Sequence, residues 1–149
     1  MIKIIFIIIV CLNTFDLKAN DKVIENIRIS DSKENKASRV VFDLSKKIPY
    51  SVFVLNNPPR LVVDIEAEKY KNYLYKESRL IKNIRVSNSE KGVIRVVFDL
   101  KNRAYIEKNF YLNKTQNTFF RLVIDIKEVV LVKNNKKNKQ VKKRKFIIT

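Results

Sequence analysis

The sequence predicts an all-β fold: a sandwich of two similar four-stranded sheets that arises from an internal duplication. Several short motifs occur twice within the 149 residues. The candidate strands are short and rich in Ile, Val, Phe and Tyr, and polar or proline-containing segments such as Asn56-Asn57-Pro58-Pro59 separate them. Because 46% of the residues are apolar, the composition also fits a folded domain with a core.

The first element in chain order is an apolar N-terminal segment. Lys3 precedes a nearly unbroken apolar run from Ile4 to Leu12, and Ala19 precedes polar residues. This layout is typical of a secretory signal peptide, and the run is shorter than the roughly 20 residues that span a bilayer. We predict that residues 1–19, which include Cys11, are a signal peptide and that the protein is secreted across the inner membrane. An uncleaved anchor and a buried strand are the alternatives.

The first copy of the repeat, about residues 23–66, is expected to contain four strands. A period of two places Val40, Phe42 and Leu44 on one face of the second strand and leaves Arg and Asp on the other face. The fourth strand has the same division, with Leu61, Val63 and Ile65 inward. The four strands contain Ile27-Arg28-Ile29-Ser30, Arg39-Val40-Val41-Phe42-Asp43-Leu44, Tyr50-Ser51-Val52-Phe53-Val54-Leu55 and Arg60-Leu61-Val62-Val63-Asp64-Ile65.

The second copy, about residues 80–127, repeats these segments in the same order. The matching segments are Ile84-Arg85-Val86-Ser87, Arg95-Val96-Val97-Phe98-Asp99-Leu100, Tyr105 to Leu112, and Arg121-Leu122-Val123-Ile124-Asp125-Ile126. We expect a hairpin from the first two strands of each copy and one four-stranded sheet per copy, with the apolar faces packed together. Residues 69–78 join the copies as a short helix or a turn.

The sequence changes character after residue 130. From Lys133 to Lys145, eight of thirteen residues are Lys or Arg and none is acidic, which is typical of a flexible basic linker. Phe146-Ile147-Ile148-Thr149 then reads as the start of another strand. We therefore assign residues 20–130 to one β domain and residues 131–149 to a linker and the start of a missing domain.

The composition excludes several classes of catalytic site. A chain with no His and one Cys cannot form the common zinc sites or a Ser-His-Asp or Cys-His arrangement. A glycosidase acid pair is also excluded, because an Arg lies four positions from each outward Asp and lowers a carboxyl pKa that a general acid needs raised. Those carboxylates are Asp43, Asp64, Asp99 and Asp125. We expect no catalytic residue, no metal and no cofactor.

The outward arginines of the repeated strands are the candidate binding residues: Arg39, Arg60, Arg95 and Arg121. If the second and fourth strands pair antiparallel, Arg39 faces Asp64 and Arg60 faces Asp43, in ion pairs worth about 0–1 kcal/mol each. The planar donors of Arg also suit hydroxyls and carboxylates of a ligand. Both interpretations can hold together. The net charge of +17 does not point to nucleic acid, because the basic tail lacks interleaved aromatic residues and the protein is predicted to be secreted.

The order of these segments resembles the AMIN domain. The resemblance covers about residues 23–127 and rests on Arg39 to Leu44, on Asn57-Pro58-Pro59-Arg60 leading into Leu61 to Ile65, and on Arg95 to Leu100. It implies a sandwich of two symmetric sheets that binds peptidoglycan in the periplasm and, in amidases, directs the enzyme to the division site. Peptidoglycan is then the expected partner of the four arginines, with cell-division or envelope proteins as further candidates and no nucleic acid.

A second resemblance lies at the C-terminal end. Arg144-Lys145-Phe146-Ile147-Ile148-Thr149 is similar to the first catalytic strand of AMIN-containing N-acetylmuramoyl-L-alanine amidases, which leads into a segment with a zinc-ligand His. We interpret the chain as the non-catalytic targeting portion of such an enzyme. The alternatives are that the chain represents the amidase itself as an N-terminal fragment, or that it is the wall-tethering domain of a secretin or pilus-assembly protein. The enzyme assignment therefore stays open.

Overall fold

The computed structural model describes residues 21–32, 36–71, 78–89, 92–116 and 118–130. The predicted signal peptide and the predicted linker lie outside these ranges. The described residues form strands and turns. No helix in this part of the chain is long and apolar enough to cross a membrane.

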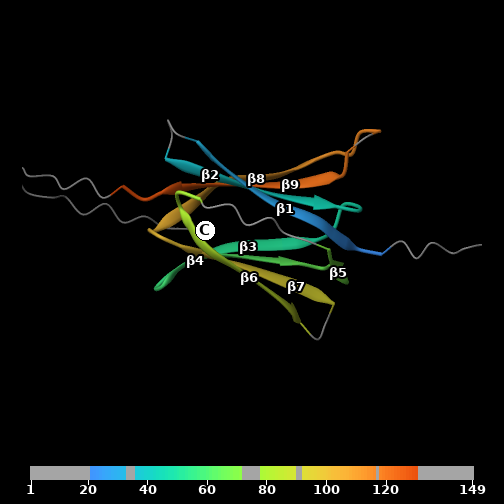
Figure 1. The fold of residues 1–149 in the computed structure, drawn as a ribbon, viewed down its shortest axis with the longest axis horizontal. Coiled ribbons are helices and arrows are strands. Elements are labelled where there is room, and N and C mark those ends of the chain that lie inside the picture. Colours follow the sequence, from blue (N-terminus) through green and yellow to red (C-terminus); the bar gives the residue numbers. More distant parts are fainter. Residues whose placement is uncertain (1–20, 33–35, 72–77, 90–91, 117, 131–149) are drawn as a thin grey trace, which may run out of the picture.

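The strands form two layers, as predicted (Figure 1). Sheet A has the order β5-β1-β2-β9-β8, and sheet B has the order β3-β4-β7-β6. Sheet A has a fifth strand because β5, in the segment predicted to be a helix or turn, pairs parallel with the start of β1. The strands are β1 (Val23–Ser32), β2 (Ala37–Leu44), β3 (Tyr50–Asn56), β4 (Pro59–Ile65), β5 (Lys69–Tyr70), β6 (Ile81–Ser89), β7 (Val93–Leu100), β8 (Ala104–Leu112) and β9 (Phe120–Glu128).

Each sheet contains strands from both copies of the repeat, so the expectation of one sheet per copy is wrong. The β1–β2 hairpin of the first copy joins β9 and β8 of the second, and the β3–β4 hairpin joins β7 and β6. The new contacts are the antiparallel pairs β2–β9 and β4–β7. This exchange places the four strands with the Arg-and-Asp motif at the centres of the sheets, where their inward residues are buried most completely.

The two predicted hairpins are present and have matching geometry. Ile27 lies opposite Phe42 in the first hairpin, and Ile84 lies opposite Phe98 in the second. Both first strands contain a register shift near their start, and both turns contain a residue with positive φ, Lys36 in one and Gly92 in the other. The matched sequence segments therefore occupy corresponding positions in the two hairpins.

The core lies between the sheets and is formed by the residues that the period of two turned inward. Phe42 of sheet A and Phe98 of sheet B meet edge to face, with 6.1 Å between their ring centroids. The predicted inward residues of β2 and β4 are fully buried. Since each sheet is covered by the other, the charged residues between these positions face outward from the sandwich.

Candidate functional site

The strand exchange builds a ladder of charged residues on each outer face. On sheet A, Arg39 lies opposite Asp125 and Arg121 lies opposite Asp43. On sheet B, Arg95 lies opposite Asp64 and Arg60 lies opposite Asp99. Cross-strand pairing of Arg with Asp was predicted, but the predicted partners, Arg39 with Asp64 and Arg60 with Asp43, are wrong because those residues lie in different sheets.

Arg39 and Arg95 are held by bidentate hydrogen bonds within the ladders. Arg39 donates from Nε and Nη2 to the two carboxylate oxygens of Asp125, at 2.6 and 2.9 Å. Arg95 donates in the same way to Asp64, at 2.7 Å for both bonds. The hydrogen bond from Arg39 lowers the pKa of Asp125, although burial of this carboxyl acts in the opposite direction. These two predicted binding residues are therefore already paired with carboxylates of the protein.

Arg60 and Arg121 differ because other arginines occupy the carboxylates opposite them. Asp43 accepts two hydrogen bonds from Arg28, at 2.9 and 2.6 Å, and Asp99 accepts two from Arg85, at 3.1 and 2.7 Å. Arg60 Nε lies 3.6 Å from the nearer oxygen of Asp99, beyond hydrogen-bond distance. The Nε atoms of Arg60 and Arg121 are buried and have no hydrogen-bond partner among the described residues.

The structure thus divides the four predicted arginines into two classes. Arg39 and Arg95 stabilise the sheets through bidentate hydrogen bonds, whereas the Nε atoms of Arg60 and Arg121 are buried without an acceptor, at equivalent positions on opposite faces. The division depends on Arg28 and Arg85, which the sequence analysis did not select. Their signal was present, since both lie in a repeated segment.

Arg60 and Arg121 each lie beside apolar residues of an edge strand. Leu55 of β3 is opposite Arg60, and Leu112 of β8 is opposite Arg121. Phe53 and Phe110 occupy the next outward positions of the same edge strands, opposite Val62 and Val123. Leu55 and Leu112 are 42% and 38% exposed. These residues could not be selected from the sequence, because an apolar side chain on an edge strand looks the same in sequence as a core residue.

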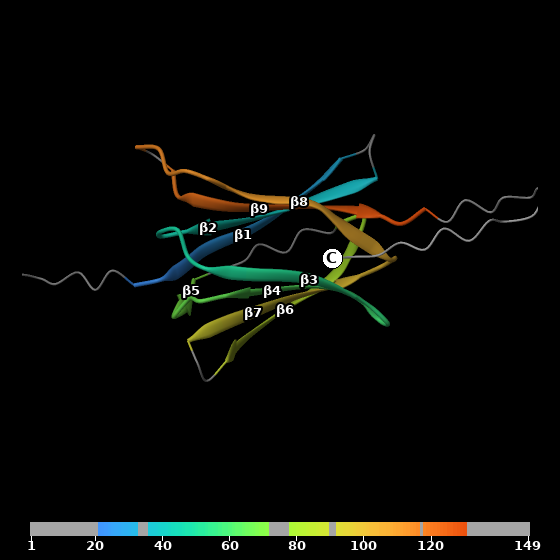
Figure 2. The same ribbon diagram turned by 180° about the vertical axis from the view of Figure 1, so that it is seen from behind.

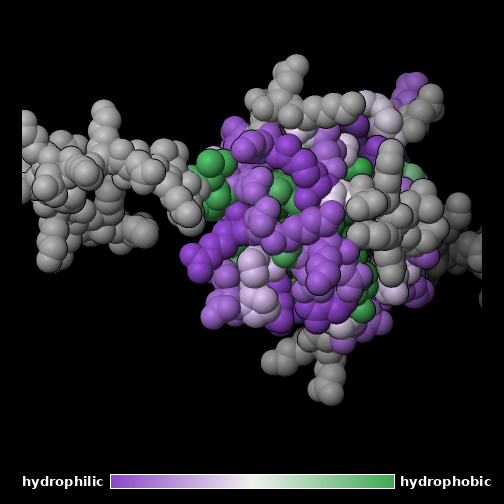
Figure 3. Space-filling model, turned by 60° about the vertical axis from the view of Figure 1, so that its left-hand side comes forward, coloured by the Kyte–Doolittle hydropathy of each residue, from purple (hydrophilic) through white to green (hydrophobic). Residues whose placement is uncertain are grey.

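The two outer faces differ in charge at one end. Lys127 follows Ile126 in β9, whereas Glu66 follows Ile65 after β4. Lys108 lies 3.5 Å from Asp125, which adds a second cation beside the Arg39 pair. A cavity of about 360 Å³ lies at this end of sheet A, and its lining includes both lysines. Figure 3 shows one side of the molecule, where small apolar areas are separated by hydrophilic surface.

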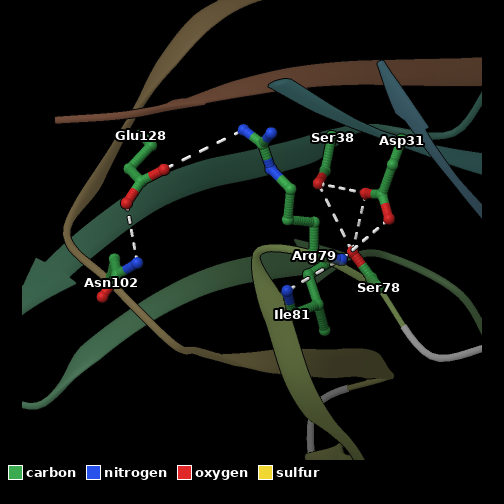
Figure 4. A network of polar contacts seen from close by, with 7 residues as sticks. All are labelled: Asp31, Ser38, Ser78, Arg79, Ile81, Asn102 and Glu128. Atoms are coloured by element: carbon green, nitrogen blue, oxygen red, sulfur yellow. Dashed lines mark hydrogen bonds and ion pairs between the residues drawn. The ribbon is translucent and has the colours of Figure 1, made fainter. Parts of the chain in front are cut away.

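A separate polar cluster joins the segment before β6 to sheet A (Figure 4). The Asp31 carboxylate accepts hydrogen bonds from Ser38 Oγ at 2.5 Å, Ser78 Oγ at 2.8 Å and the backbone N–H of Arg79 at 2.7 Å. Burial acts to raise the pKa of Asp31, but these hydrogen bonds lower it overall. Ser38 and Ser78 are almost fully buried. Because the donors and the acceptor satisfy one another, this cluster has a structural role.

The described residues contain no group of three or more acidic or Cys side chains that could hold a metal ion. The outer faces, with their unpaired arginine donors and neighbouring apolar side chains, therefore form the candidate site.

Comparison with known families agrees with the fold and with the repeated motifs. The sequence profile of the AMIN domain matches residues 26–119, which include residues of every strand from β1 to β8. Comparison with curated proteins finds no match. AMIN domains are peptidoglycan-binding and targeting modules that occur in secreted amidases and secretins. With more than half of its length matched, the chain belongs to the AMIN domain family.

Proposed function

We propose that both outer faces bind peptidoglycan, and that the domain localises a cell-wall hydrolase in the bacterial envelope without contributing catalytic residues. The observation that carries the proposal is the repeated placement, beside exposed apolar residues, of an arginine that donates no hydrogen bond to the carboxylate opposite it. Arg60 with Leu55 forms this arrangement on sheet B, and Arg121 with Leu112 forms it on sheet A. The same arrangement on two opposite faces is consistent with a ligand that repeats.

The chemistry of each face suits a wall polymer. Peptidoglycan presents sugar hydroxyls and stem-peptide carboxylates, and a guanidinium group that is not held by a bidentate hydrogen bond to the protein can bind either through its terminal nitrogens. Phe53 and Leu55 offer an apolar surface for the carbon faces of sugar rings.

Two binding faces on one rigid sandwich favour retention of the domain on the repeating peptidoglycan network. Once one face has bound a glycan strand, the second face remains at a high effective concentration near other strands. A contact that is weak at each face can therefore hold the domain on the wall. The opposite orientation of the faces in Figure 1 suits contact with two strands at once.

Among wall proteins, an N-acetylmuramoyl-L-alanine amidase is the class that the sequence favours. Arg144 to Thr149 is similar to the first catalytic strand of AMIN-containing amidases. These residues lie outside the described ranges, so this part of the proposal rests on sequence. The described β domain would then position the hydrolase, and the chemistry would belong to a zinc domain.

The proposal predicts that Arg60→Gln combined with Arg121→Gln reduces the amount of protein retained on purified sacculi. We expect a loss of about tenfold or more, because each Gln removes a charge-assisted hydrogen bond worth roughly 1.5–3 kcal/mol. Co-sedimentation with sacculi measures the bound fraction. The control Lys69→Gln with Lys71→Gln removes the same charge from exposed side chains near β5 and should leave retention unchanged.

Deletion of residues 133–145 separates this mechanism from diffuse electrostatics. If the faces bind the wall, the shortened protein still co-sediments. Loss of binding on this deletion, together with loss at moderate salt for the wild type, would show that the charged tail binds and that the faces do not.

A further inference from the structure

One of the sheet edges lacks the features that protect the others. Edge strands expose unpaired backbone groups, and proteins usually protect them with charges, bulges or covering segments. β6 contains Lys82 and Arg85 and a register shift near its start. β8 contains Glu107 and Lys108 and a register shift between Ile106 and Lys108. The start of β1 is covered by β5.

β3 has none of these features. Its seven residues, Tyr50 to Asn56, include no charged residue, no Gly and no Pro, and its register with β4 is continuous. Among the described residues, β3 pairs in a sheet with β4 alone, although its inward residues Tyr50, Val52 and Val54 pack against the core and the strand contacts β8 of sheet A. Tyr50 Oη donates to Asn109 Oδ1 at 2.6 Å, and its ring meets the Tyr111 ring edge to face. Figure 2 shows β3 at the border of its layer, in front of β4.

We propose that β3 pairs antiparallel with β3 of a second copy of this chain, so that two sheets B become one continuous sheet across a two-fold axis. The order of residues in β3 fits this pairing. With Phe53 on the axis, Val52 lies opposite the partner subunit's Val54, and Phe53 lies opposite the partner subunit's Phe53. Ser51 then faces the partner subunit's Leu55. The three central positions therefore meet side chains of the same kind, whereas Ser51 meets a leucine.

Charge favours β3 over the other edges for self-pairing. The chain has a net charge of +17, so association of two copies requires a surface where cations do not meet. Pairing of β6 with itself would bring Lys82 and Arg85 of two copies close together, whereas β3 contributes no charge.

The outward apolar residues of β3 would gain apolar neighbours from a partner strand, while the outer face of the sheet stays open. Phe53 and Leu55 are 38% and 42% exposed, although they lie in the middle of a strand. Pairing would give Phe53 an aromatic neighbour and would satisfy the free backbone groups of β3. A two-fold pairing uses each β3 once and leaves the charged β6 strands at the new ends, so assembly stops at the dimer. This inference does not depend on wall binding.

Sedimentation velocity on the full chain tests the proposal, with Phe53→Lys as the disrupting variant. The wild type should form a concentration-dependent dimer in the micromolar range, about 1–100 µM. Phe53→Lys should weaken the dimer at least about tenfold, because two lysines would meet on the axis. The control Tyr105→Lys makes the same type of change at an exposed aromatic residue of the β8 edge and should leave the dimer intact.

Hydrogen exchange supplies a measurement that does not depend on the folding of a variant. In the wild type, amides of residues 50–56 should become more protected as protein concentration rises, while those of β8 should not change. A wild type that stays monomeric at about 100 µM, or a dimer that Phe53→Lys leaves intact, would overturn the proposal. Oligomers larger than a dimer would also overturn the proposal, since a two-fold pairing uses the only β3 edge of each copy.

Discussion

At the scale of single residues, Asp31 is the polar group on which the joint between the copies depends most. Its carboxylate accepts hydrogen bonds from two buried serine hydroxyls and from the backbone N–H of Arg79. Those donors come from β2 and from the segment that leads into β6. One exposed side chain therefore holds the start of the second copy against sheet A.

Asp31→Ala should lower the free energy of unfolding by about 1–2 kcal/mol, because two buried hydroxyls lose their charged acceptor. Denaturant unfolding measures the change. Glu107→Ala is the matched control, since it removes a carboxylate whose ion pair with Lys127 is exposed and should have little effect. Equal losses in both variants would mean that the Asp31 cluster has no special role in stability.

Asp125 makes stability depend on pH in the acid range. The hydrogen bond from Arg39 lowers the pKa of Asp125 below its ordinary value of 3.8. As the pH falls, the unfolded chain therefore takes up this proton before the folded protein does. The contribution of Asp125 is complete above the unfolded pKa and is lost as the pH falls through the lower, folded pKa.

Denaturant unfolding between about pH 6 and pH 2 should show this loss for the wild type. Asp125→Asn should lower stability near neutral pH and should flatten the decline at acid pH, because residue 125 no longer titrates. If the variant were less stable but kept the full acid decline, the titration of Asp125 would not contribute to it, and the decline would belong to other carboxyls such as Asp31, whose pKa is also lowered.

At the scale of elements, the sequence predicted the first hairpin of each copy, β1–β2 and β6–β7, but not the second hairpins, β3–β4 and β8–β9, nor which hairpins share a sheet. The alternation in Arg39 to Leu44 and in Arg60 to Ile65 correctly gave the inward residues, because the period of a strand is a local property. The choice of neighbouring strand is not local. Asp64 and Asp125 occupy the same place in matching motifs, so Arg39 could face either of them, and the sequence alone offers no basis for choosing.

The candidate site, like the fold, was predictable from the sequence only in its local features. The outward direction of Arg39, Arg60, Arg95 and Arg121 followed from alternation. The difference between the paired and the unpaired arginines could not be predicted, because it arises from competition by Arg28 and Arg85 for Asp43 and Asp99. That competition exists only once β1 lies beside β2 and β6 lies beside β7, with the registers that the structure shows.

At the scale of the whole molecule, the exchange of strands makes the two copies depend on each other. The first copy contributes one hairpin to each sheet, and neither hairpin has its central neighbour unless β9 and β7 of the second copy are present. Phe42 and Phe98 illustrate the dependence, since the two buried rings in contact come from different copies. A separated copy would consist of two hairpins with exposed apolar faces.

This interlocking predicts that a fragment of residues 20–67 does not fold alone, whereas an equimolar mixture with residues 78–130 recovers structure. A chain of this size buries too little surface for a stable core, and isolated two-stranded hairpins are at best marginally stable in water. Each fragment should give an unfolding curve without a cooperative transition and poorly dispersed amide resonances. The mixture should regain dispersion and a transition whose midpoint rises with concentration, because β2–β9 and β4–β7 pairing restores both sheet centres. A cooperative transition for residues 20–67 alone would show that one copy can form its own sheet, and that the exchanged topology is not required for stability.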